Sequence, residues 1–172
     1  MNNIGKRIMI IGSPGSGKST FSRKLAEITQ IPLIHLDKEY WNYGWVETPK
    51  EEWVKKQEML ITGNEWIADG NYGGTMDMRI ERADTIISFE LGRVRCLMSY
   101  FKRVITNLNR IRPDMPEGCP EKLDFQFVKY IWHFPKASGR RNLERLERNK
   151  DKQIIVFKKR SEANKFIKEL DK

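Results

Sequence analysis

The fold is decided by residues 7–20, which read Arg-Ile-Met-Ile-Ile-Gly-Ser-Pro-Gly-Ser-Gly-Lys-Ser-Thr. The largely apolar and β-branched run at residues 7–11 predicts a buried strand. Residues 12–19 match the pattern G-x-x-x-x-G-K-[S/T] in full, and Phe21, Leu25 and Ile28 then share one face of a predicted helix. A strand, a glycine-rich loop and a helix in this order predict a phosphate-binding loop.

The residue types of this loop suit the phosphates of a nucleotide. Glycines let main-chain N–H groups turn inward, and the following helix directs its positive end at the phosphates. Lys18 would reach the β- and γ-phosphate oxygens, and the Ser19 hydroxyl would ligate Mg²⁺. The sequence therefore predicts ATP and Mg²⁺ as cofactors, with these nucleotide-binding residues: Gly12, Ser13, Pro14, Gly15, Ser16, Gly17, Lys18, Ser19 and Thr20.

Further strands and helices alternate along the chain. Short apolar runs predict strands at 32–36, 65–68, 85–89 and 153–157, and helical patterns occupy 18–28, 48–61, 94–108, 124–134, 141–148 and 162–170. The helix at 48–61 starts with a capping box, Thr48-Pro49-Lys50-Glu51. Strands alternating with helices predict an α/β fold, a five-stranded, mostly parallel sheet flanked by helices.

The composition is that of one folded domain. The 172 residues match a single domain of 1–172, 39% of them are apolar, and no apolar run is long enough to cross a bilayer. Cys96, Cys119, His35 and His133 lack the close spacing of metal sites, which argues against a disulfide framework or structural zinc. We therefore expect a soluble, cytoplasmic protein. Neither the composition nor the residue spacing indicates an oligomeric state.

The second half of the chain is strongly basic. Residues 1–90 carry a net charge of −2 and residues 91–172 a net charge of +11. The segment Arg112–Pro120 contains three prolines and a glycine, which excludes regular structure and predicts a mobile lid at about 111–123. Such charge suits the triphosphate of a nucleotide with a phosphorylated or nucleotide acceptor, and it also suits nucleic acid.

Other classes of P-loop protein are less consistent with the chain. A GTPase needs a base-recognition Asn/Thr-Lys-x-Asp, which is absent, and a motor needs a long second domain. A compact chain with a basic, proline-broken segment favours a small-molecule kinase that closes over its phosphates. A nucleic-acid-binding protein with a regulatory ATP site is the alternative. It is not favoured, because no helix-turn-helix, zinc-finger or RNA-binding signature occurs.

Five motifs together resemble one family over nearly the whole chain. They are Gly12–Ser19, Ile34–Asp37, Tyr40–Asn42, Trp66–Tyr72 and Arg112–Pro120. The combination is similar to the bacterial DNA topology modulation proteins, a branch of the adenylate-kinase-like P-loop kinases. This resemblance implies a nucleoside-monophosphate-kinase-like core with a lid and ATP as donor, whereas the family's phosphate acceptor is poorly defined.

One segment departs from adenylate kinases proper. They would have Asp-Gly-Phe-Pro-Arg where this chain has Asp69-Gly70-Asn71-Tyr72-Gly73-Gly74. AMP is therefore not the expected acceptor. Arg79, which follows this segment, resembles the arginine that grips the acceptor in adenylate-kinase-like folds; a surface arginine is the other interpretation.

Two carboxylates follow predicted strands at the edge of the sheet where ligands gather. Asp69 is a candidate Mg²⁺ residue, as the Walker-B Asp is in related enzymes, or a turn-forming Asp-Gly. Asp37 is a candidate to bind the acceptor hydroxyl or to deprotonate it, or a helix cap. Trp41, shortly after Asp37, is expected in the acceptor-binding region at about 37–64.

Arginines around the lid are the candidates for stabilising the transferred phosphoryl group. Arg103 and Arg110 precede the lid loop and are assigned to the donor side. Arg140 and Arg141 follow Gly139 and resemble the arginines after the lid. The predicted catalytic residues are Lys18, Asp37, Arg103 and Arg140. The predicted activity is ATP-dependent phosphoryl transfer to a nucleotide or a hydroxyl compound.

Overall fold

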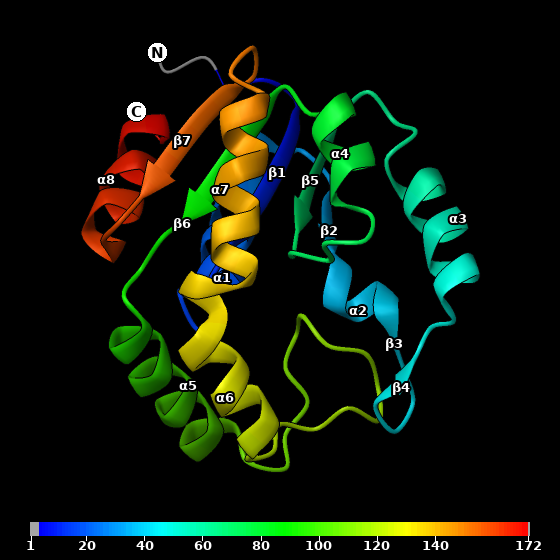
Figure 1. Cartoon of the computed structure of the whole chain (residues 1–172), viewed down its shortest axis with the longest axis vertical. Helices are drawn as coiled ribbons and strands as arrows, with labels where there is room; N and C mark the ends of the chain where they lie inside the picture. Colours follow the sequence, from blue (N-terminus) through cyan, green and yellow to red (C-terminus); the bar gives the residue numbers. More distant parts are fainter. Residues whose placement is uncertain (1–3, 172) are drawn as a thin grey trace.

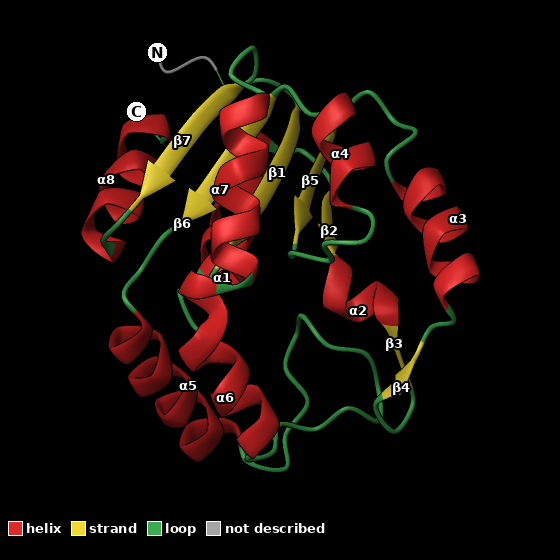
Figure 2. Cartoon of the chain, in the orientation of Figure 1, coloured by secondary structure: helices red, strands yellow, loops and turns green. Residues whose placement is uncertain are grey.

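A five-stranded parallel sheet forms the centre of the computed structural model, which describes residues 4–171. The strand order is β2-β5-β1-β6-β7, with every neighbouring pair parallel (Figures 1 and 2). The strands are β1 (Arg7–Gly12), β2 (Leu33–His35), β5 (Trp66–Asp69), β6 (Thr85–Phe89) and β7 (Gln153–Phe157). The predicted α/β class and the five-stranded parallel sheet are confirmed.

Helices cover both faces of the sheet (Figure 1). Alternate residues of β1 face opposite sides, so that Ile8 and Ile10 join one buried cluster and Met9 and Ile11 the other. The first cluster includes residues of α1, α5, α6 and α8, and the second includes residues of α4 and α7. Burial on both faces explains why β1 is apolar without alternation. The helices are α1 (Lys18–Thr29), α3 (Lys50–Leu60), α4 (Met76–Arg82), α5 (Arg93–Asn107), α6 (Phe125–His133), α7 (Ser138–Arg148) and α8 (Arg160–Leu170).

The start of the acceptor-binding region differs from the prediction. Strand β2 ends at His35, and Asp37 lies in the first turn of a short helix, α2 (Leu36–Tyr40), rather than at a strand end. A small antiparallel hairpin follows, formed by β3 (Trp41–Asn42) and β4 (Val46–Glu47). Two-residue strands carry too little pattern to be recognised in a sequence.

The predicted capping box of the next helix is wrong. Helix α3 begins at Lys50 after Pro49, without a side-chain cap. The Thr48 hydroxyl instead donates to the main-chain oxygen of Tyr40 and accepts a hydrogen bond from Asn42 Nδ2 at 3.3 Å. Thr48 therefore closes the hairpin, because it has a main-chain partner there that the sequence pattern does not reveal.

The segment between α5 and α6 has no regular structure beyond a single bridge between Leu108 and Glu121. The expected absence of helix and strand at 112–120 is confirmed, whereas the mobile lid at about 111–123 remains a prediction. The segment lies against the hairpin, where the Gly44 N–H donates to Gly118 O at 3.1 Å and Cys119 Sγ lies 3.3 Å from Asn42 O. A one-turn 3₁₀ helix, η1 (Phe134–Lys136), joins α6 to α7.

Within residues 4–171, none of the helices combines the length and the apolar character that a membrane crossing requires.

Candidate active site

The phosphate-binding loop leaves β1 at Gly12 and ends where α1 begins at Lys18. Gly15 has a φ of +75°, and a Cβ there would lie 2.4 Å from the carbonyl oxygen of Cys96, so that only glycine fits. The Lys18 Nζ donates to Ser13 O at 2.9 Å. The Lys18 side chain thus lies against the loop. The first turn of α1 leaves main-chain N–H groups without partners inside the helix.

The loop has the features that a nucleotide's phosphates require. The Ser16 side chain is buried, and its hydroxyl has no hydrogen-bond partner within residues 4–171. Enclosure in the site lowers the pKa of Lys18, whereas the charges of Asp69 and Asp37 oppose this shift. A hydroxyl without a partner, a helix N-terminus and an enclosed ammonium group together fit a triphosphate with its metal ion.

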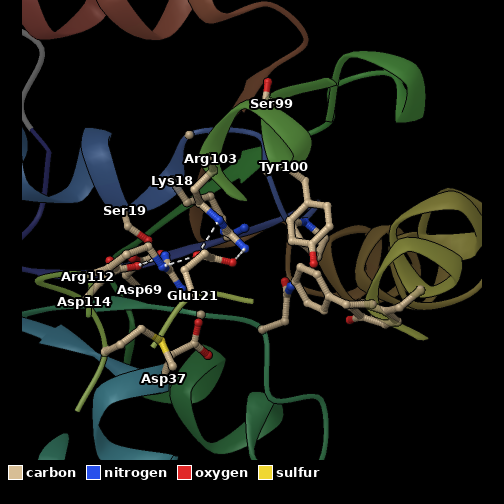
Figure 3. Close-up of a pocket in the computed structure, with 18 of the residues that line it drawn as sticks. Lys18, Ser19, Asp37, Asp69, Ser99, Tyr100, Arg103, Arg112, Asp114 and Glu121 are labelled. Carbon is tan, nitrogen blue, oxygen red and sulfur yellow. Dashed lines mark hydrogen bonds and ion pairs between the residues drawn. The ribbon is translucent and has the colours of Figure 1, made fainter. Parts of the chain in front are cut away.

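The loop lines one side of a cavity of about 1070 Å³. Lys18, Ser19, Asp37 and Asp69 all border this cavity, so four predicted site residues from three segments of the chain are brought together (Figure 3). The parallel sheet explains their meeting, because β1, β2 and β5 are neighbours and all end at this edge. Trp41 borders the same cavity and is half-buried.

Asp69 lies at the end of β5 among polar partners. Its Oδ2 accepts a hydrogen bond from Ser22 Oγ at 3.3 Å and lies 3.1 Å from His35 Nδ1. Burial alone would raise the pKa of Asp69, but His35, Lys18 and Ser19 together hold it below its usual value. The residue is therefore an ionised carboxylate beside Ser19, the donor type that Mg²⁺ prefers.

Asp37 borders the same cavity in a different environment. Its Oδ1 accepts a hydrogen bond from the Tyr72 hydroxyl at 2.7 Å. Burial raises the pKa of Asp37, and the Asp69 charge adds to the rise, while Tyr72, Arg112 and Lys18 oppose it. Two carboxylates in one cavity thus have pKa values shifted in opposite directions, which is typical of an acid–base group next to a metal ligand.

Two arginines enter the cavity together with carboxylates of the lid segment. Figure 3 shows Arg103 of α5 and Arg112 of the loop pointing toward Glu121. Glu121 Oε2 lies 3.0 Å from Arg103 Nε and 2.7 Å from Arg112 Nε, without hydrogen-bond geometry. Arg112 Nη1 also donates to Asp114 Oδ2 at 2.7 Å. Charges of the chain itself thereby neutralise both guanidinium groups.

Three of the predicted arginines do not lie in the cavity. Arg79 is fully buried, and its guanidinium donates to main-chain oxygens of residues 70–75, so it supports a loop and has no open side for an acceptor. Arg110 is exposed and does not border the cavity. The side chain of Arg140 is 76% exposed and pairs with Glu144 one turn further along α7. These positions give no support to the three assignments.

Other arginines line the cavity in place of these three. Arg112, Arg141, Arg145 and Arg160 all border the cavity. Arg160, at the start of α8, donates to the carbonyl oxygens of Gly15 at 2.8 Å and Ser16 at 3.1 Å. Nothing in the local sequence marks Arg160, because it lies 144 residues from Ser16 and only the sheet order brings them together.

Residues that sequence reasoning passed over complete the site. His35, considered in the sequence only as a metal ligand, contacts Asp69, and Tyr72 contacts Asp37. Each contact joins residues that lie far apart in the sequence. The only indication in the sequence is that His35 ends a strand and that Tyr72 follows shortly after one.

Comparisons with known proteins identify the fold. No protein-family model matches the chain, and no curated protein matches its sequence. A gluconokinase from Sinorhizobium meliloti 1021 has a TM-score of 0.55 at 12% identity, over 98% of this chain and 91% of the gluconokinase. A shikimate kinase from Bacteroides thetaiotaomicron has a TM-score of 0.50 at 16% identity, over 95% of both chains.

A third solved structure, a protein from Chloroflexus aurantiacus J-10-fl provisionally described as a kinase, has a TM-score of 0.52 at 12% identity, over 98% of this chain and 97% of that one. At these identities the similarity concerns the fold. The chain therefore has an α/β, P-loop kinase-like fold.

Proposed function

We propose that this protein transfers the γ-phosphoryl group of ATP to a hydroxyl group of a small molecule. The observation that carries the proposal is the cavity bordered jointly by Lys18, Asp37, Arg103 and Arg112. Phosphoryl transfer needs positive charge around the γ-phosphate and a base near the attacking hydroxyl, and these residues supply both. The kinase-like fold supports the same reaction class.

Each side of the cavity has a separate task. Residues 12–20 hold the phosphates of ATP, with Lys18 on the β- and γ-phosphate oxygens. Ser19 and Asp69 would hold Mg²⁺, which neutralises charge that builds up on the β- and γ-phosphate oxygens. Arg103 and Arg112 would move from Glu121 to the transferred phosphoryl group.

Asp37 would act on the acceptor. As the acceptor oxygen bonds to the γ-phosphorus, its proton passes to the Asp37 carboxylate, and the bond from the γ-phosphorus to the bridging oxygen breaks to release ADP. A carboxylate repels a phosphate monoester but can receive the proton of a hydroxyl group. With Arg79 buried and unable to offset that repulsion, a hydroxyl compound is favoured over a nucleoside monophosphate.

The motifs that resemble the DNA topology modulation proteins lead us to propose membership of that branch and action in the cytoplasm. The alternative function, nucleic-acid binding with a regulatory ATP site, took its support from the basic second half of the chain. Part of that charge lines the cavity, where the arginines of this half outnumber its carboxylates: Arg103, Arg112, Arg141, Arg145 and Arg160 border it, against Asp114, Glu121 and Asp124. The cavity thus accounts for basic residues that would otherwise suggest a polyanion.

The test is a panel of hydroxyl compounds and nucleotides incubated with ATP and Mg²⁺, with ADP formation and phosphorylated products measured by mass spectrometry. One compound should be phosphorylated by the wild-type protein and not by the Lys18→Ala variant. Duplex DNA binding with a steep salt dependence, without any phosphorylated product, would support the alternative function instead.

A further inference from the structure

The side chain of Asn71 extends the central sheet by one rung. Strands β1 and β5 pair as far as Ile10 and Asp69, and the Gly70 N–H donates to Ile10 O at 3.1 Å. The main chain then turns away from the sheet. Asn71 Oδ1 accepts from the Gly12 N–H at 3.0 Å, and Asn71 Nδ2 donates to Gly12 O at 2.9 Å. A carboxamide carries the same donor and acceptor as a peptide group, so it can replace the missing strand.

The residue held in this way is the first residue of the phosphate-binding loop. Gly12 has a φ of +130°, and a Cβ there would lie 2.3 Å from Phe89 O. Strand β6 holds Gly12 on its other side, and the next N–H, that of Ser13, donates to Phe89 O at 3.2 Å. The main chain of β6 therefore holds Gly12 on one side, and the side chain of Asn71 holds it on the other. These contacts set the direction in which the loop leaves the sheet.

Arg79 holds the backbone that carries Asn71. Its Nη1 donates to Gly70 O at 3.0 Å, and its Nη2 donates to Tyr72 O at 3.0 Å and to the main-chain oxygen of Asn71. Burial lowers the pKa of Arg79 to about 9, which shows the electrostatic cost of placing a guanidinium here. The carbonyl oxygens that partly offset this cost all belong to residues 70–75, and they fix that loop.

The same amide also contacts a helix on the lid side of the cavity. Asn142 Nδ2 of α7 donates to Asn71 Oδ1 at 3.4 Å. Its neighbour Arg141 borders the cavity, as does Arg145 one turn later. One oxygen atom of Asn71 is thus shared between the N–H of Gly12 and the helix that brings these arginines to the site.

We propose that Asn71 is a positioning residue that fixes the start of the phosphate-binding loop and couples it to α7. Occupation of the loop by MgATP then stabilises α7, and displacement of α7 loosens the loop. The inference rests on the proposed function, because it assumes that the loop binds MgATP. Its test therefore measures MgATP binding and needs no acceptor.

The first measurement is MgATP affinity by isothermal titration calorimetry, at protein concentrations where circular dichroism shows each variant folded. Asn71→Ala removes both bonds to Gly12 and should raise the Kd for MgATP about tenfold, since each lost bond to a buried main-chain group is costly. Asn149→Ala is the matched control: it also removes an amide bonded to a main-chain carbonyl, but one at the far end of α7, and it should leave the Kd within about twofold.

The second measurement detects coupling and would not respond to a merely structural role. Hydrogen exchange of residues 138–148 is followed with and without saturating MgATP. In the wild-type protein MgATP should slow exchange in α7, and this protection should be lost in Asn71→Ala even at saturation. Asn142→Ala leaves the bonds to Gly12 intact, so it should lose the same protection with a smaller change in Kd, and it decides the question if Asn71→Ala does not fold.

Wild-type affinity in Asn71→Ala, or full protection of α7 in both variants, would overturn the inference while leaving the proposed function intact. Absence of MgATP binding by the wild-type protein would instead remove the proposed function and the inference together.

Discussion

The donor side and the lid side of the cavity are held in different ways. On the donor side, Gly12 is fixed between β6 and Asn71, and Arg160 binds two further carbonyls of the loop. On the lid side, residues 108–124 form no helix and contact the hairpin through a few bonds, such as that from Gly44 to Gly118. We therefore predict that main-chain pairing keeps the donor side rigid and that the lid side opens more readily.

This difference matches what each proposed substrate would require. A triphosphate needs N–H groups held in fixed directions before it binds. An acceptor must enter and leave, and water must be excluded between these events, which requires a segment that moves. The predictions below change one side at a time, from the largest expected effect to the smallest.

Replacing the lysine of the donor side should have the largest effect. Lys18→Ala should lower ATP turnover at least about 1000-fold, because the ammonium group neutralises charge on the transferred phosphoryl group. Steady-state kinetics with the acceptor found in the panel measures this effect, and circular dichroism checks the fold. Lys24→Ala, an exposed lysine on the same helix, is the control and should retain wild-type turnover. Equal ATP affinity and turnover in Lys18→Ala would contradict the assignment of the loop.

The acceptor side should show a smaller but still large effect. Asp37→Asn should lower kcat about 100-fold or more, the usual contribution of a positioned general base, with little change in ATP affinity. Asp151→Asn, which alters an exposed carboxylate outside the cavity, should change kcat little. Near-normal turnover in Asp37→Asn would leave Asp37 a structural role and favour a nucleotide acceptor.

The pH profile gives an independent check on Asp37. Burial raises the pKa of this carboxyl, so its base form is lost as the pH falls through a value above that of an ordinary aspartate. Activity should therefore fall on the acidic side of the profile at this raised pKa. The groups that face Asp37 are Tyr72, Asp69, Arg112 and Lys18. Tyr72→Phe removes a hydrogen bond that stabilises the ionised form, so it should move the acidic limb to still higher pH, and an unchanged limb would exclude Asp37 as the base.

The donor side could be predicted from the sequence because its information is local. The loop motif, the strand before it and the helix after it are contiguous, and the strands at 85–89 and 153–157 are predicted with the bounds that the structure has. The apolar run at 85–89 is buried throughout, whereas 153–157 is an edge strand in which only Phe157 is buried, but both runs have the β-branched composition of a strand.

The lid side could not be predicted to the same depth because its information is long-range. The loop turns Arg112 inward and leaves Arg110 exposed, since only Arg112 meets both Asp114 and Glu121. Arg79 is buried because α4 packs its side chain under the loop 70–75, which sequence spacing does not show. An irregular segment has no hydrophobic periodicity, so its sequence does not distinguish buried positions from exposed ones.

A moderate effect is expected at the carboxylate that links the two sides. Glu121→Gln removes the charge between Arg103 and Arg112, so that the phosphates of ATP no longer compete with it. The Kd for MgATP should fall about fivefold, the gain expected from releasing charge-assisted contacts. Calorimetry measures the change, and Glu117→Gln, an exposed position of the same segment, is the control. A raised Kd in Glu121→Gln would mean that the carboxylate holds the arginines ready for the phosphates.

The smallest effect is expected where the lid segment meets the hairpin. Gly118 has a φ of +77°, and a Cβ there would lie 2.2 Å from Cδ2 of Tyr43. Gly118→Ala should therefore separate the segment from the hairpin, with faster hydrogen exchange at residues 111–123 and a loss of only about 1 kcal/mol in the free energy of unfolding. Gly63→Ala is the control, because a Cβ at that position meets ordinary contacts at 3.7 Å or more.

A double variant separates the two causes of this effect. Tyr43→Ala with Gly118→Ala removes the clash and leaves only the unfavourable φ, so exchange in the segment should return part of the way toward wild type. Hydrogen exchange at residues 12–19 should stay unchanged in Gly118→Ala and in the double variant, because the main-chain bonds of residues 12–19 lie on the donor side. Faster exchange in that loop after Gly118→Ala would show that the two sides open together, and the contrast between a rigid donor side and a movable lid side would then fail.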